Sequence, residues 1–236
     1  MLGLLIIIVI SWLLLHFFEK KSIDVLGIMP SVKRAFQFFV GFIVISLIAL
    51  INIYVETRIL NIDWELKTVS YRTIFNALWY HLKSALTEDL IFRGAILYIL
   101  IRRIGAKWAI LISALFFGVY HVFSYGMTGE RLIPILYVIL VTGFTGYVWA
   151  YGFYKTKSIM MGLGFHLGVN IINTFFFESQ PYGELIFKAI SKVELRDWDW
   201  LYFSLFKGLF PSIVTLIFVK QYIKFKSKNI PKELNQ

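Results

Sequence analysis

Hydrophobic residues occur in long runs along this chain, and short polar segments separate the runs. Several runs reach the roughly 20 residues that a helix needs to cross the hydrocarbon core of a bilayer. The pattern predicts an all-α fold, a polytopic transmembrane helix bundle of about seven spans, with six to eight as the range. The expected spans are residues 2–18, 35–55, 73–101, 108–125, 132–154, 158–177 and 200–223.

Two segments need a separate interpretation. The first run has no positive residue before Lys20 and no small-residue cleavage site, so we interpret it as a retained span rather than a signal peptide. Segment 183–193 would add an eighth span if it re-entered the membrane. Its charged residues Glu184, Lys188 and Lys192 favour an amphipathic helix at the surface instead.

The composition supports a membrane protein. Of 236 residues, 58% are hydrophobic and 16% are charged, and the mean hydropathy is +0.72. A soluble domain would carry about 25% charged residues. We expect one transmembrane domain over residues 1–236, with a catalytic core at about 73–178. The chain has no cysteine, which excludes disulfides, thiolate metal sites and cysteine nucleophiles.

The net charge of +10 comes mainly from short loops beside the apolar runs. Alternate loops and the C-terminal tail carry fourteen Lys and Arg residues, and the opposite loops carry seven. The positive-inside rule then places the N-terminus outside and the C-terminus in the cytoplasm. This distribution favours contact with membrane lipid and not with nucleic acid. The tail cations are Lys220, Lys224, Lys226, Lys228 and Lys232.

Three charged residues lie within six positions in the middle of the third run. Glu88 and Asp89 are adjacent, and Arg93 follows four positions after Asp89. A charge at bilayer depth is costly and usually faces a protein interior or a wet cavity. The spacing of Asp89 and Arg93 suits an ion pair within one helix. Glu88 points about 100° away from Asp89, so we expect it to face other polar helices.

Further polar residues lie at a similar depth on two other runs. His121 follows Phe117 by four positions, and Asn170 follows His166 by four, so each pair shares one helical face. Counted from the basic flanks at ~1.5 Å per residue, Glu88 and His121 lie ~21 Å deep, and His166 and Asn170 lie ~14 and ~20 Å deep. We therefore expect these groups to converge from three helices.

Each residue also has a plainer interpretation. In this interpretation, Asp89 and Arg93 only form a buried ion pair whose charges cancel. A lone His121 is more often a core histidine than a functional one. A lone Asn170 more often bridges helices by hydrogen bonding. The remaining histidines, His16 and His81, are interpreted as interfacial or structural. The glycines Gly162, Gly164 and Gly168 are expected to allow close helix packing.

Together these motifs resemble the CPBP family, the CAAX proteases and bacteriocin-processing (Abi) membrane proteases, including the type II CAAX prenyl endopeptidases. The family pattern is Glu-Glu-x-x-x-Arg, then Phe-x-x-x-His, then His-x-x-x-Asn or Asp. It matches Glu88 to Arg93, Phe117 to His121 and His166 to Asn170, with Gly94 after the first motif. The second family glutamate is Asp89 here, one methylene shorter.

The resemblance implies peptide-bond hydrolysis inside the membrane. Glu88 and His121 would activate water, while His166 and Asn170 would stabilise the oxyanion. Asp89, Arg93 and Phe117 would support the site. A metal alternative stays open, because Glu88, His121 and His166 also make a His₂Glu set like that of many catalytic zinc sites. We favour the metal-free glutamate mechanism, with no cofactor.

The resemblance further implies a membrane-bound peptide or lipidated protein as substrate, in a bacterial plasma membrane, with roles such as peptide processing or bacteriocin immunity. The alternative is a non-catalytic membrane protein, either a transporter or an immunity protein that acts by binding, because buried charges also mark proton relays.

Overall fold

The computed structural model describes residues 2–228, and the predicted all-α fold is confirmed. Lys232 of the basic tail lies outside this range. The described residues form eight α-helices, one 3₁₀ turn and one pair of short strands. The helices are α1 (Leu2–Glu19), α2 (Val32–Leu60), α3 (Tyr71–Arg93), α4 (Ala95–Ile104), α5 (Ala106–Ser124), α6 (Leu132–Thr156), α7 (Met160–Phe176) and α8 (Asp197–Lys228); the turn is Ile23–Leu26, and the strands are β1 (Asp63–Leu66) and β2 (Phe187–Ser191).

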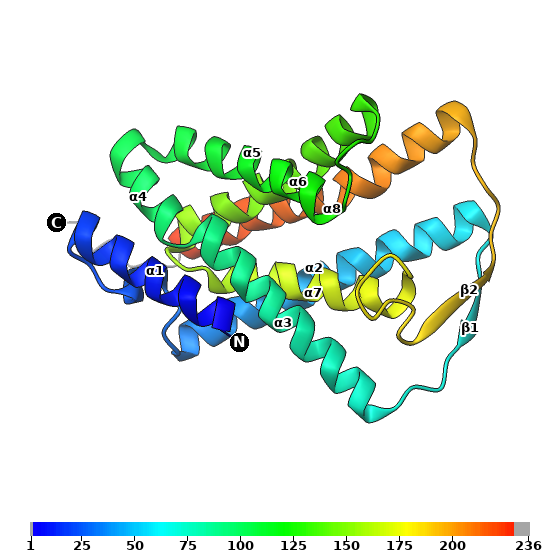
Figure 1. The fold of residues 1–236 in the computed structure, drawn as a ribbon, viewed down its shortest axis with the longest axis horizontal. Helices are drawn as coiled ribbons and strands as arrows, with labels where there is room; N and C mark the ends of the chain where they lie inside the picture. The colour runs from blue at the N-terminus through cyan, green and yellow to red at the C-terminus, as the bar shows by residue number, and fades with distance from the viewer. Residues whose placement is uncertain (1, 229–236) are drawn as a thin grey trace.

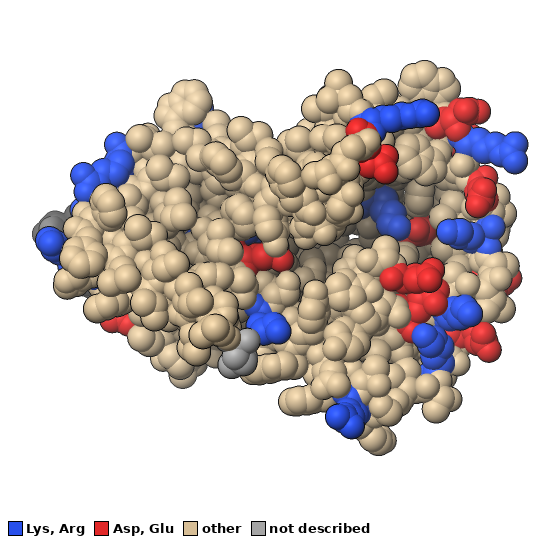
Figure 2. Space-filling view, viewed as in Figure 1, with Lys and Arg blue, Asp and Glu red and all other residues tan. Residues whose placement is uncertain are grey.

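Helices α2, α5, α6, α7 and α8 run lengthwise through the molecule, whereas α1 and α4 lie at one end of it (Figure 1). Between residues 2 and 228, five helices are long and apolar enough to cross a membrane, namely α1, α2, α5, α6 and α8. Helix α7 is apolar but has only 17 residues. Figure 2 shows charged side chains of both signs gathered at the end that carries the strands, and a mostly uncharged surface along the rest of this face.

The third predicted span is broken. Instead of one helix over 73–101, α3 ends at Arg93 and α4 begins at Ala95, with Gly94 between them. A Cβ atom on residue 94 would collide with the carbonyl oxygen of Leu90, so the chain can bend here only because residue 94 is glycine. The bend separates the charged helix α3 from the apolar start of α4.

We expect Gly94→Ala to lower the stability of the protein by about 1–3 kcal/mol, because the added methyl group forces the helix junction apart. The melting temperature of the purified protein in detergent measures this effect. Gly152→Ala is a matched control, because a Cβ atom at position 152 would meet no neighbour within 4 Å. Equal melting temperatures for the two variants would contradict the role given to Gly94.

Two helix pairs pack closely through small residues. Gly164 and Gly168 of α7 lie against the backbone of α2, where a Cβ atom would clash with main-chain atoms of residues 38 and 42. Gly118 of α5 lies in the same way against the main chain of Ile139 in α6. The packing predicted for Gly164 and Gly168 is confirmed, whereas Gly162 has only ordinary contacts with Trp149.

Segment 183–193 is not the amphipathic helix expected from its charges. Its residues Phe187–Ser191 form β2, which pairs antiparallel with β1, more than 100 positions earlier in the chain. The pairing joins the end of α2 to the segment after α7. Lys188 and Lys192 have helical spacing. The segment nevertheless forms a strand, because β1 in the connection between α2 and α3 pairs with it.

Candidate active site

Helix α3 presents the first group of the site. The side chain of Glu88 is 13% exposed and points toward His121 of α5 and His166 of α7. Ser84, one turn earlier on the same face, donates a hydrogen bond from its hydroxyl to Oε1 of Glu88 at 3.2 Å. This bond fixes one carboxylate oxygen and leaves Oε2 directed at the two histidines.

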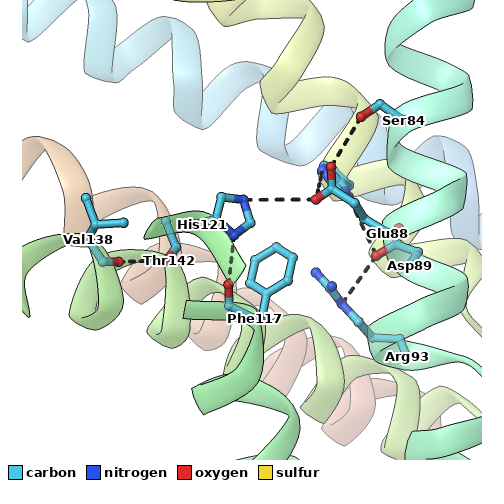
Figure 3. A network of polar contacts seen from close by, with 9 residues as sticks. Ser84, Glu88, Asp89, Arg93, Phe117, His121, Val138 and Thr142 are labelled. Atoms are coloured by element: carbon cyan, nitrogen blue, oxygen red, sulfur yellow. Dashed lines mark hydrogen bonds and ion pairs between the residues drawn. The ribbon is translucent and has the colours of Figure 1, made fainter. Parts of the chain in front are cut away.

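His121 of α5 faces Glu88 (Figure 3). Its Nε2 lies 4.0 Å from Oε2 of Glu88, and its Nδ1 lies 2.8 Å from the carbonyl oxygen of Phe117. A carbonyl oxygen only accepts hydrogen bonds, so Nδ1 must carry the proton. In the neutral ring, Nε2 is then a proton acceptor that faces the carboxylate.

His166 of α7 lies between the two adjacent carboxylates. Its Nε2 is 3.7 Å from Oε2 of Glu88, and its Nδ1 is 3.6 Å from Oδ1 of Asp89. The two carboxylates point in different directions from α3, as their spacing predicts, yet they reach opposite edges of one imidazole. Asp89 therefore touches the candidate site itself, in addition to forming its ion pair.

The predicted pair of Asp89 and Arg93 is present. Nε of Arg93 lies 3.2 Å from Oδ1 of Asp89, and both side chains are almost fully buried. The guanidinium carbon lies 4.1 Å from the ring centre of Phe117 and 4.9 Å from that of Trp149. The negative faces of these rings favour a cation at this position.

A cavity of about 800 Å³ adjoins Glu88, His121 and His166. Asn170 lines the same cavity, one turn after His166 on α7. A second chamber of about 360 Å³ continues from it between α2, α6 and α8. Figure 2 shows the molecule hollowed on this face, between α3 and the helices α5 and α6. Polar groups from separate helices thus meet at a space large enough for an extended peptide segment.

Sequence reasoning missed several residues of this site. Trp149 packs against His166 with the two rings tilted and their centres 4.8 Å apart, and Tyr125, Tyr137 and Lys207 line the cavity. The chain has 23 Phe, 13 Tyr and 7 Trp residues, so an aromatic residue in an apolar run carries no distinguishing signal. Lys207 lies well inside the last predicted span. An isolated charge at such a position usually faces a protein interior or a cavity, and this could have identified Lys207 from the sequence.

The other two histidines lie apart from this group. His16 is exposed on α1, beside the rings of Trp12 and Phe17. His81 is buried on α3, with Nε2 at 3.0 Å from the carbonyl oxygen of Pro181 and 2.7 Å from the hydroxyl of Thr174. His81 thus attaches the segment after α7 to α3, beside the cavity that both of them line.

The donor set does not fit a metal ion. Glu88, His121 and His166 were the ligands of the metal alternative. In the described part of the chain, no three His, Cys, Asp or Glu side chains are arranged to hold an ion. We therefore derive no step of the reaction through a metal.

The comparison with protein families agrees with the motifs. A family model described as type II CAAX prenyl endopeptidase Rce1-like matches residues 70–172, the segment from α3 to most of α7. This segment is similar to the Rce1-like proteases, and the apolar helices around it indicate an integral membrane protein. No curated protein and no solved structure matches the chain.

Proposed function

We propose that this protein is an intramembrane endopeptidase that hydrolyses a peptide bond in a membrane-associated peptide or a lipidated, CAAX-type protein. The proposed catalytic core is residues 73–178. The observation that carries the proposal is the meeting of one carboxylate and two imidazoles, from α3, α5 and α7, at the wall of a large cavity.

Glu88 and His121 activate the water in this mechanism. A separation of 4.0 Å is too long for a direct hydrogen bond but suits a water molecule that contacts both groups. Oε2 of Glu88 and Nε2 of His121 are both acceptors, so this water donates one hydrogen to each. Its lone pair attacks the scissile carbonyl carbon while Glu88 takes the proton, which it later gives to the leaving amine.

His166 and Asn170 stabilise the oxyanion of the tetrahedral intermediate. Nε2 of His166 faces the cavity, where its N–H donates to the oxyanion, and Asn170 adds its amide from the next turn of α7. Asp89 orients the ring, and Arg93 holds Asp89. Asp89 is one methylene shorter than the second glutamate of the family, but its side chain still reaches both Arg93 and His166.

The distribution of basic residues supports an orientation with the strands outside and the C-terminal end of α8 in the cytoplasm. The cavity lining includes Ser179, Gln180 and Pro181, which follow α7 at the end of the molecule that carries the strands. In this orientation a substrate reaches Glu88 from the outer side of the membrane.

The test uses purified protein in lipid nanodiscs and peptides anchored by a prenylated cysteine, with products identified by mass spectrometry. We expect cleavage by the wild type and its loss in His121→Ala and His166→Ala, both still folded by circular dichroism. Intact peptide with folded wild-type protein would favour the transporter or binding alternative.

Chelation separates the two hydrolytic mechanisms. We expect 1,10-phenanthroline and EDTA to leave the cleavage rate within about twofold of the untreated rate, because the proposed water is activated by Glu88 and His121 alone. A loss of activity that added zinc restores would overturn the metal-free mechanism, although not the protease function.

A further inference from the structure

Lys207 is a charged residue of the cavity that the proposed reaction does not use. It lies in α8, and its side chain lines both the large cavity and the adjoining chamber. Among the described residues that line these two spaces, Lys207 is the one Lys or Arg, and Glu88 is the one Asp or Glu. The cavity lining therefore contains one carboxylate, that of Glu88, and one ammonium, that of Lys207.

Neighbouring helices hold Lys207 in place. Its Nζ donates a hydrogen bond to Oε1 of Glu56 in α2 at 2.6 Å and lies 4.2 Å from the ring centre of Phe177. The side-chain amide of Asn52, also on α2, donates to the main-chain oxygen of Lys207 at 3.0 Å. These contacts fix the position of the ammonium before any ligand arrives.

The ammonium keeps hydrogen-bonding capacity on the cavity side. An ammonium has three N–H donors, and Glu56 uses one of them in the described structure. The Lys207 side chain is 35% exposed, whereas that of Glu56 is 8% exposed behind it. The charge of the Lys207 ammonium is therefore balanced by Glu56, but its N–H donors are only partly used. It faces the same cavity as Glu88.

We propose that Lys207 binds a carboxylate of the peptide substrate and so sets the direction in which the peptide lies. This inference rests on the proposed peptidase function. A substrate carboxylate would take the remaining N–H donors in charge-assisted hydrogen bonds, which are among the stronger contacts in a partly dehydrated cavity. The anionic part of the peptide then lies at Lys207, and the scissile bond lies at Glu88.

Four peptides identify the carboxylate. They share one sequence and one lipid anchor and carry either a C-terminal acid or a C-terminal amide, combined with either an acidic side chain or its amide beside the cleaved bond. For the wild type, we expect removal of the recognised carboxylate to raise KM by about ten- to hundredfold with little change in kcat. The peptide that loses affinity tells a C-terminal group from a side chain.

The variants test whether Lys207 is responsible. Lys207→Met should raise KM for the acid peptide to the amide value and leave the amide peptide unchanged, and Lys207→Arg should keep the preference. The double variant Glu56→Gln with Lys207→Met removes both charges, so its results do not depend on an unpaired buried carboxylate. Lys188→Met, an exposed lysine of β2 that does not line the cavity, is the matched control.

A binding experiment separates this inference from the proposed function. The Glu88→Gln variant is titrated with fluorescent acid and amide peptides in nanodiscs, which needs no cleavage. Tighter binding of the acid peptide that disappears with Lys207→Met supports the inference even if no peptide is hydrolysed. Equal binding of acid and amide, or an equal loss for both in Lys207→Met, would reduce Lys207 to a structural link between α2 and α8.

Discussion

Replacement of Glu88 by glutamine is expected to lower the rate of peptide hydrolysis by about 10²–10⁴-fold, which is the usual contribution of a general acid–base group. The amide has nearly the same shape and can still accept the hydrogen bond from Ser84. It cannot take a proton from water, so the fold remains while the chemical step is lost. Initial rates with a prenylated peptide in nanodiscs measure the effect.

The control for this prediction is Glu130→Gln, which removes a carboxylate from the exposed loop between α5 and α6. We expect this variant to keep the wild-type rate. A Glu88→Gln protein with wild-type kcat would assign the activation of water to another residue, and His121 would then be the remaining acceptor at the site.

The second large effect is expected on stability. Asp89→Asn removes the negative partner of a guanidinium that is only 2% exposed. Loss of one member of a buried ion pair costs about 3–5 kcal/mol, because the remaining charge is left without compensation. We expect a clearly lower melting temperature in detergent, together with reduced activity, since His166 also loses its contact with Asp89.

Two variants give this prediction its contrast. The double variant Asp89→Asn with Arg93→Met removes both charges and should recover part of the lost stability, although not the activity. Asp89→Glu restores the glutamate of the family pattern and keeps the charge, so it should stay close to the wild type in melting temperature. If Asp89→Asn melts like the wild type, the rings of Phe117 and Trp149 would be sufficient to hold Arg93.

Much of the helical framework was predictable, because a bilayer requires long apolar segments, and every run of this kind is helical, although the third is divided into α3 and α4. The depth estimate placed Glu88 and His121 at one level, and their side chains face each other in the structure, because the rise per residue is nearly constant in a helix. It placed His166 about one turn shallower, although the His166 side chain also reaches Glu88. The break at Gly94 was not predicted. Its cause is a contact between main-chain atoms, and hydropathy contains no information about that.

Other features depend on partners distant in sequence. The strand β2 forms because β1 lies beside it, and no local pattern in Phe187–Ser191 identifies that partner. Trp149 and Lys207 enter the site because α6 and α8 pack around α7, which the order of spans alone does not determine. The motif residues were found because charges and histidines are rare in apolar runs, whereas aromatic residues are common there.

The contacts of Phe117 explain why a phenylalanine precedes the histidine by four positions. In a helix this spacing puts the main-chain oxygen of residue 117 under the ring of His121, where it holds the Nδ1 proton. The same spacing leaves the phenyl face turned toward α3, where it covers the Arg93 guanidinium. Phe117 thus sets the tautomer of the His121 imidazole with its backbone and shields the Arg93 guanidinium with its side chain. Moving Phe117 or His121 by a single position would leave these two contacts on different residues.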